Sequence, residues 1–339
     1  MRRSLLAILL AVLGFSALNC KAQDKQPLKL IKTTPLPGYT GDLDHFGLDL
    51  KGNRLFLAAE EPKTVEVFDL RTGDRIHTIS GFGHPLTMAY LPESNQLIVT
   101  NGDTDDLELV DCKDYKIIKT LKLGKGVDHG VLNPVNKYFY VENGGGPDAK
   151  THSLAIVDST SFKIVGEISG LSGDSNEGMV INRAGNKLYM NLTGSDEVGV
   201  IDLKTRQIVA KWPLPDAHVT HAIALDEPHH RLFTASRNPP RFIVFNTDNG
   251  KVVASLPCVG VNSDMSIDVA HKRIYVTGSD TASVFLQKDA DNYEHLAEVP
   301  TAYRAKSSIF VPQLNRLYVA DSGKGKPDAQ LAMQVFEVQ

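Results

Sequence analysis

A short motif returns seven times along the chain at nearly even spacing. Each copy is a turn rich in Asn or Lys followed by a bulky apolar stretch, as in Asn53–Leu57 and Asn315–Val319. The first apolar positions of the copies are Leu55, Leu97, Tyr138, Leu188, Leu232, Ile274 and Leu317, with spacings of 42, 41, 50, 44, 42 and 43 residues. A period of about 40–45 residues with β-type units is typical of β-propeller blades. The repeat therefore predicts seven blades.

Each repeat has the pattern of four strands. The third strand alternates and ends in Asp or Asn, as in Val65–Asp69 and Val198–Asp202, which is strand chemistry followed by a turn-forming side chain. Because this acid or amide recurs in five repeats, we interpret it as a turn former and not as a catalyst. The last repeat ends at Gln339 without a fourth strand, and Leu28–Thr33 at the N-terminus offers a spare one. We predict an all-β fold: one domain over 28–339, a seven-bladed β-propeller of four-stranded antiparallel blades, its last blade closed by the N-terminal strand.

The first residues of the chain indicate export. Arg2 and Arg3 precede an apolar run over Leu5–Leu18, too short for a transmembrane helix and typical of a signal peptide. Cys20-Lys21-Ala22 predicts cleavage after a signal peptide of residues 1–22. The alternative is a lipoprotein signal over 1–19 that leaves Cys20 lipidated. We expect a periplasmic or secreted protein, with the lipid anchor at Cys20 as the alternative and no transmembrane span.

Charge and cysteine content narrow the function. The net charge is −4 and no basic stripe is present, so we expect no nucleic-acid partner. Cys112 and Cys258 could form one bridge or remain separate thiols, and their spacing is not that of a metal site. The 50-residue spacing predicts a Gly-rich loop around Gly144–His152 in the third repeat. No phosphate loop or nucleophile elbow is found.

The entry to each innermost strand lies at the mouth of the central channel of a propeller, and polar residues recur there. The candidate ligand-binding residues at these equivalent positions are Asp44, His45, His84, Asp128, His129, Glu177, His218, His221, Asp264 and Arg304. Convergent polar groups in a concavity are the default binding hypothesis. Polar residues also fill solvated propeller channels without any ligand, so the pattern alone leaves both interpretations open.

Imidazole and carboxylate groups around one axis could hold a divalent metal. The candidate metal ligands are His45, His129, Glu177, His221 and Asp264. Such an ion could activate a water molecule, and a His–carboxylate pair could act as a general base without metal.

The repeat cores Ile274–Thr277 and Leu317–Ala320 resemble the YVTN-type propeller repeat. The resemblance covers residues 28–339, and the whole chain looks like a YncE-like periplasmic propeller protein. It implies the fold and does not imply a reaction. We expect a binding or interaction protein of the envelope that takes a small ligand or an envelope protein. The alternative is a metal-assisted hydrolase or lactonase-like enzyme, by analogy with six-bladed gluconolactonase-type propellers.

Overall fold

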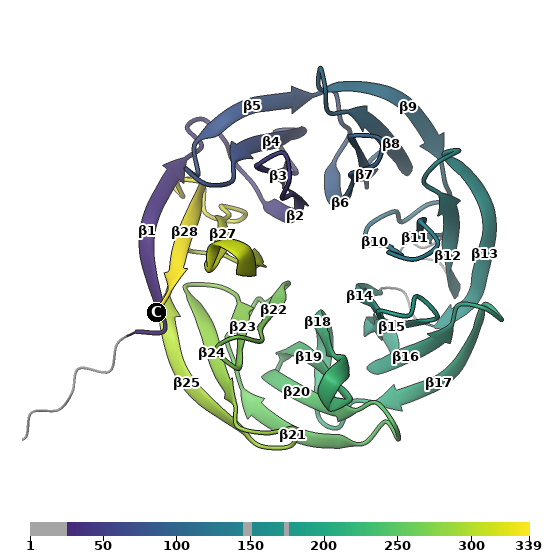
Figure 1. Ribbon diagram of the computed structural model, residues 1–339, viewed down its shortest axis with the longest axis vertical. Coiled ribbons are helices and arrows are strands. Elements are labelled where there is room, and N and C mark those ends of the chain that lie inside the picture. The colour runs from purple at the N-terminus through teal and green to yellow at the C-terminus, as the bar shows by residue number, and fades with distance from the viewer. Residues whose placement is uncertain (1–25, 145–150, 173–175) are drawn as a thin grey trace, which may run out of the picture.

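The structure is a computed structural model that describes residues 26–144, 151–172 and 176–339. Within these residues, 28 strands form seven four-stranded sheets, which stand as blades around a central channel (Figure 1). The seven-bladed propeller predicted from the repeat is confirmed. The predicted signal peptide lies outside the described residues, as do positions 145–150 of the predicted loop.

The blades follow the chain in order, with the innermost strand first. Blade one is β2 (Leu43–Asp49), β3 (Arg54–Ala59), β4 (Thr64–Asp69) and β5 (Arg75–Ser80); blade two is β6 (Pro85–Leu91), β7 (Gln96–Asn101), β8 (Asp106–Asp111) and β9 (Lys116–Lys122); blade three is β10 (Gly130–Leu132), β11 (Tyr138–Asn143), β12 (Thr151–Asp158) and β13 (Lys163–Ser172). Blade four is β14 (Glu177–Ile181), β15 (Lys187–Leu192), β16 (Glu197–Asp202) and β17 (Gln207–Pro213).

The remaining blades include the one that closes the ring. Blade five is β18 (His218–Asp226), β19 (Arg231–Asn238), β20 (Pro240–Asn246) and β21 (Val252–Pro257); blade six is β22 (Met265–Asp268), β23 (Arg273–Thr277), β24 (Thr281–Gln287) and β25 (Tyr293–Pro300); blade seven is β26 (Ser307–Val311), β27 (Arg316–Asp321), β28 (Ala332–Val338) and the N-terminal β1 (Leu28–Pro35). Short 3-10 helices follow β15, β18 and β26: η1 (Thr193–Ser195), η2 (Glu227–His229) and η3 (Pro312–Leu314).

The predicted closure of the last blade is confirmed. Strand β1 pairs antiparallel with β28 from Leu28 opposite Val338 to Pro35 opposite Ala332. The two strands lie side by side at the rim of the ring (Figure 1). This pairing joins the two ends of the described chain and covers the outer edge of β28, which would otherwise be open to pairing with another molecule.

Two local devices explain why the repeat makes blades. One residue just ahead of each second strand adopts a left-handed conformation: Asn53, Asn95, Lys137, Gly185, His230, Lys272 and Asn315, with φ between 52° and 69°. Asn and Gly tolerate this region best. The acid or amide that ends each third strand accepts backbone N–H bonds from the following turn in five blades: Asp69, Asp111, Asp158, Asp202 and Asn246. Their predicted role as turn formers is confirmed.

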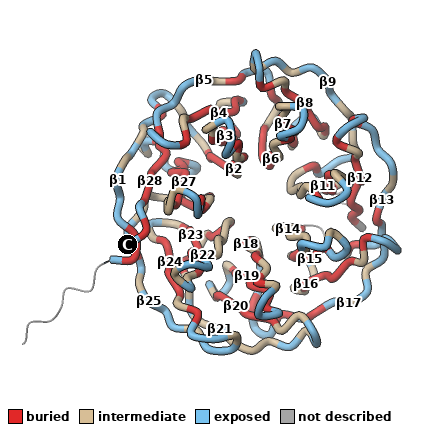
Figure 2. The backbone as a smooth tube through the Cα atoms, in the orientation of Figure 1, coloured by how far each residue is buried: buried red, intermediate tan, exposed pale blue. Residues whose placement is uncertain are grey.

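The core lies between the blades. The second and third strands of each blade are mostly buried, whereas the outermost strand faces solvent, as the tube in Figure 2 shows. Trp212 at the end of β17 stacks on Phe245 of the next blade, with ring centroids 5.7 Å apart, so it packs between blades. Cys112 and Cys258 are free thiols. In the described part of the chain no helix is long and apolar enough to cross a membrane.

Candidate binding site at the channel mouth

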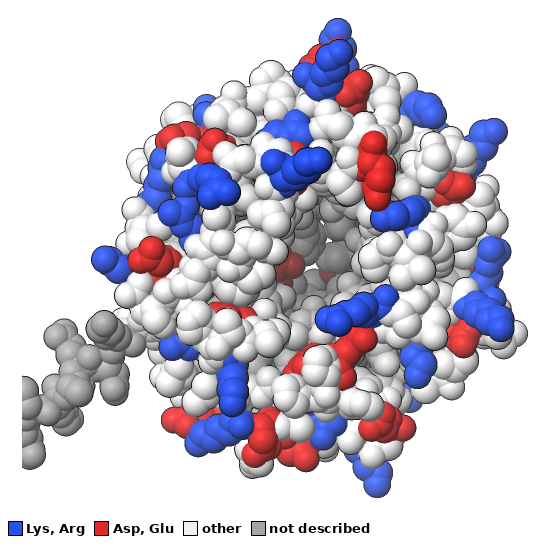
Figure 3. Space-filling model, in the orientation of Figure 1, with Lys and Arg blue, Asp and Glu red and all other residues white. Residues whose placement is uncertain are grey.

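A cavity of about 300 Å³ lies where the innermost strands begin. Every lining residue except Leu86 is polar or charged. The lining residues are Asp42, Asp44, His45, Glu60, His84, Leu86, Asp128, His129, Glu177, His221, Arg237, Ser263, Arg304, Lys306 and Lys324. We call this cavity of about 300 Å³ the mouth cavity. Figure 3 shows that the axis of the ring is also hollowed on the face drawn, with acidic groups visible inside.

The structure brings eight of the ten predicted residues into the mouth cavity. These are Asp44, His45, His84, Asp128, His129, Glu177, His221 and Arg304. Asp264 lines an adjoining cavity of about 180 Å³, which shares His45 and His129 with the mouth cavity. His218 does not join them: it lies outside both cavities, its side chain is 54% exposed, and it pairs with Asp196 at 2.6 Å. His218 lies three positions before His221, and in this strand that distance carries His218 away from the channel.

Irregular pairing at the start of the innermost strands directs side chains into the channel. The register shifts between Leu43 and Phe46 in β2, and between Thr220 and Ile223 in β18. Similar shifts occur at the same place in β6 and β14. A bulge bends its strand and redirects the side chains it carries. The shift in β2 carries Asp44 and His45, and the shift in β18 carries His221.

The centre of the site is a pair of histidines. The Nε2 atoms of His45 and His129 lie 2.9 Å apart, with the rings at 72° to one another. Nδ1 of His45 lies 3.0 Å from an oxygen of Asp264. Nδ1 of His129 lies 3.2 Å from Glu177 and 3.3 Å from Asp128. Carboxylates therefore stand at both ends of the pair.

These carboxylates control protonation at the pair. Burial opposes the charged form of His45, but Asp264 and Asp44 outweigh it and raise the pKa of His45 to about 10. Burial alone would raise the pKa of Glu177, yet His129 and His221 outweigh it and lower this pKa to about 2. Burial lowers the pKa of His221 itself. Negative charge at this point is thus held by neighbouring imidazoles.

The side of the mouth formed by blades seven and one is built from closed ion pairs. Arg304 donates two hydrogen bonds to Asp42, at 3.1 and 2.7 Å. Lys306 donates to Asp44 at 2.9 Å, and both side chains are less than 10% exposed. His84 lies 3.2 Å from Glu60.

Arg237, which lines the mouth cavity, and Glu142, which is buried behind His129, are absent from the set predicted from the sequence. Arg237 donates to the carbonyl of Asn262 at 2.7 Å and to Ser263 at 2.8 Å. Glu142 accepts a bond from the backbone N–H of His129 at 3.1 Å. Both residues lie near the ends of second strands. In each blade the antiparallel second strand ends beside the start of the first strand. This pairing is the signal that could have located both residues from the sequence.

The five predicted metal ligands do not form one coordination sphere. They separate into His45 with Asp264, and Glu177 with His129 and His221. Among the described residues, the one group of three whose ligand atoms all lie within 4.8 Å of one another is Asp128, His129 and Glu142. Only His129 belongs to the predicted metal set. The physical reason is that the innermost strands alone place their residues around the axis, too far apart for one ion.

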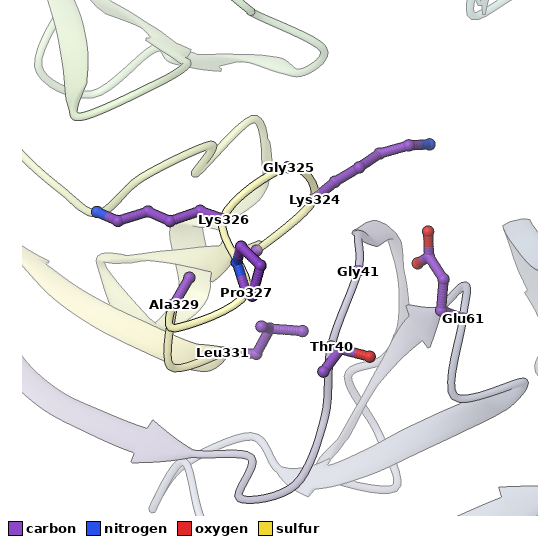
Figure 4. Close-up of a pocket in the computed structure, with 10 residues that line it drawn as sticks. Thr40, Gly41, Glu61, Lys324, Gly325, Lys326, Pro327, Ala329 and Leu331 are labelled. Carbon is purple, nitrogen blue, oxygen red and sulfur yellow. The ribbon is translucent and has the colours of Figure 1, made fainter.

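A second pocket of about 340 Å³ lies beside the mouth, between the segment Thr40–Gly41 and the loop that precedes β28. In Figure 4, the side chains of Lys324 and Glu61 extend to the same side of this pocket, whereas Lys326 points the other way. Lys326 lies over the ring of Tyr303, 5.2 Å from its centroid. Lys324 lines both pockets and so joins this groove to the mouth cavity.

The comparisons with known proteins bear on the fold of the chain and not on the chemistry of the site. No family model matches the chain. THO complex subunit 3 of Arabidopsis thaliana is 23% identical over 240 residues, which cover 71% of this chain and 65% of that protein, less than two thirds of its length. A chain of hydrazine synthase from Kuenenia stuttgartiensis superposes with a TM-score of 0.75 at 18% identity, covering 89% of this chain and 99% of that one. A chain of the mitotic checkpoint complex has a TM-score of 0.75 at 15% identity, covering 100% and 99%. At these identities the solved structures establish the propeller fold alone.

Proposed function

We propose that this protein is an exported, YncE-like envelope propeller that binds a small organic or inorganic oxyanion in the mouth cavity. The observation that carries the proposal is Arg237. Among the cations that line the cavity, Arg304, Lys306 and Lys324 each have a carboxylate oxygen within 4.0 Å, and Arg237 has none among the described residues. Its hydrogen bonds go to a carbonyl and a hydroxyl.

A partly buried guanidinium without an anion is costly, because burial penalises the charged form. Burial lowers the pKa of Arg237 for this reason, and nearby Arg304 lowers it further against the attraction of Glu177. A carboxylate or phosphate group would relieve this penalty and match the planar donors of Arg. The polar lining disfavours an apolar ligand.

The binding test uses the processed chain with inorganic phosphate and with succinate as probes, measured by calorimetry and thermal shift. Arg237→Gln should weaken binding of the preferred probe by about tenfold or more, because charge-assisted hydrogen bonds are lost. Arg241→Gln is the matched control: it removes the same group from the same blade, outside the cavity. Equal binding by both variants and the unchanged chain would refute the proposal, as would no binding of either probe.

Export is tested separately. The proposal expects a processed N-terminus in the periplasmic or secreted fraction when the whole chain is expressed in bacteria. Mass spectrometry of the processed N-terminus distinguishes cleavage after Ala22 from a lipidated Cys20. An unprocessed chain in the cytoplasm would contradict export without bearing on the oxyanion site.

A second candidate function is hydrolysis of an ester or lactone. The observation in its favour is the imidazole of His45, oriented by Asp264 at 3.0 Å and open to both channel cavities. Because the pKa of His45 is raised to about 10, this imidazole is protonated near neutral pH and can act as a general acid toward the leaving group. Initial rates with a chromogenic ester and a simple lactone test it: activity must appear in the unchanged chain and fall in His45→Ala. Absence of turnover by the unchanged chain removes this candidate.

A further inference from the structure

Blade three contains a buried carboxylate, that of Glu142, and one of its two oxygens has no hydrogen-bond partner among the described residues. Glu142 on β11 is only 3% exposed. One oxygen, Oε2, accepts the backbone N–H of His129, and the other, Oε1, has no hydrogen-bond partner among the described residues. Burial together with Asp128 and Glu177 raises the pKa of Glu142 well above its ordinary value. An unsatisfied buried polar atom of this kind calls for a partner from outside the chain, such as a water molecule or an ion.

The imidazole of His129, beside Glu142, also has a buried polar atom without a hydrogen-bond partner among the described residues. Nδ1 of His129 is buried and makes no hydrogen bond of acceptable geometry, although carboxylate oxygens of Glu177 and Asp128 lie only 3.2 and 3.3 Å away. These distances suit a hydrogen bond and the directions do not. Two ligand atoms that share one ion at about 2.1 Å are about 3.0–3.4 Å apart for octahedral to tetrahedral angles. The separation of 3.3 Å between Nδ1 of His129 and Asp128 falls in that range.

The histidine pair leaves Nδ1 of His129 available. The short contact between the two Nε2 atoms has room for one proton. If His129 supplies that proton, its Nδ1 is a lone pair facing carboxylates, which repel it. If His45 supplies it, Nδ1 of His129 is a buried N–H without an acceptor. In the first case a cation at Nδ1 takes the lone pair directly, and in the second it replaces the Nδ1 proton, which is released to solvent.

We propose that Asp128, His129 and Glu142 form a binding site for a divalent transition-metal ion such as Zn²⁺ or Mn²⁺. Their ligand atoms lie within 4.8 Å of one another, close to the spread of about 4.4 Å that one ion allows at metal–ligand lengths of about 2.2 Å. Imidazole with carboxylates is the ligand set such ions prefer. This proposal does not rest on Arg237 or on a bound oxyanion, although Asp128 and His129 also line the mouth cavity.

The rest of the histidine pair then acts as an orienting chain. With metal on Nδ1, His129 carries its proton on Nε2 and donates to Nε2 of His45, and Nδ1–H of His45 donates to Asp264. Metal-bound histidines usually donate their other N–H in this way, and the partners fix the ring. His45 and Asp264 are therefore positioning residues for the ion and not ligands to it.

The test is binding of Zn²⁺ and of Mn²⁺ to the processed chain by calorimetry, with stoichiometry from elemental analysis after dialysis. We expect one ion per chain, loss of affinity by about 100-fold or more in Glu142→Gln and Asp128→Asn, and a smaller loss of about 10–100-fold in Asp264→Asn. Glu167→Gln is the matched control, since it removes an exposed carboxylate from β13 of the same blade.

Circular dichroism and thermal unfolding identify any variant that does not fold, and the two isosteric ligand variants serve as replicates for one another. The proposal is overturned if neither metal binds the unchanged chain. It is also overturned if folded Glu142→Gln and Asp128→Asn bind metal as the control does, or if the ion is lost in His221→Ala while both ligand variants retain it. Because the assay contains no oxyanion, its failure is distinguishable from failure of the Arg237 proposal.

Discussion

On the side of the mouth formed by blades seven and one, buried carboxylates have cations at hydrogen-bond distance, whereas on blade three a buried carboxylate faces other carboxylates and an imidazole. Asp44 is matched by Lys306, but Oε1 of Glu142 is matched by nothing that the structure describes. Both of these carboxylates are buried, with Asp44 5% and Glu142 3% exposed. The difference teaches that the ion pairs of blades seven and one are complete within the chain. The groups on blade three lack a partner among the described residues, and in our proposal a metal ion from solution supplies it.

The largest effect is expected from breaking the buried ion pair between Lys306 and Asp44. Lys306→Met leaves Asp44 and Glu60 buried without their shared cation, and breaking a buried pair in this way costs about 3–5 kcal/mol of the free energy of unfolding. Denaturant unfolding measures the loss. The double variant Lys306→Met/Asp44→Asn should recover most of it; no recovery would mean that the pair is not the source of the loss.

The second largest effect is expected from lowering the pH, which should reduce the free energy of unfolding through protonation of Glu177. The folded-state pKa of about 2 lies below the ordinary value of 4.5, so the ionised carboxylate stabilises the fold above about pH 4.5 and this contribution is lost as the pH falls toward 2. We expect Glu177→Gln to be less stable than the unchanged chain by roughly 3 kcal/mol near neutral pH, with the difference shrinking through this window. A pH-independent difference would contradict the assignment. Unfolding curves from pH 2 to 7 give the answer.

Glu142 should behave in the opposite sense in metal-free protein. Its folded-state pKa is raised by burial, Asp128 and Glu177, so the carboxyl favours the fold most below its ordinary pKa and less as the pH rises above it. Glu142→Gln should therefore gain stability relative to the unchanged chain with rising pH, by about 1–3 kcal/mol at neutrality. The exposed Glu167→Gln should show no such trend. A destabilised Glu142→Gln in the presence of chelator would break the comparison between the two sides.

The smallest effect is expected at His218, which the repeat placed at the mouth and the structure places on the surface. Its pair with Asp196 is exposed on both sides, and such pairs contribute about 0–1 kcal/mol. His218→Ala should change the unfolding free energy by less than about 0.5 kcal/mol and should leave metal and oxyanion binding unaltered. Loss of either ligand in this variant would return His218 to the site.

The blades were predictable because each depends on a local signal. The left-handed turn at Asn53 or Asn315 and the acid cap at Asp69 or Asp202 repeat with a fixed period, and local signals of this kind can be read without knowing the rest of the chain. Closure by β1 followed from counting strands.

The site was predictable only in part, because its function depends on atoms and not on positions. Alignment on the first strands found His45, His129 and Glu177, which the geometry of a ring brings together. It could not show which nitrogen of His129 is engaged, since this depends on the bulge in β2 and the approach of His45. Glu142 was missed because it lies on a second strand, among residues that elsewhere form the core.

The most direct test of the central claim is anomalous diffraction from crystals of the processed chain grown with Zn²⁺. The account predicts an anomalous peak on blade three, about 2.0–2.2 Å from Nδ1 of His129 and from carboxylate oxygens of Asp128 and Glu142, with His45 still in contact with Nε2. A peak between the two Nε2 atoms, or no peak at the mouth while the metal is present in solution, would contradict it.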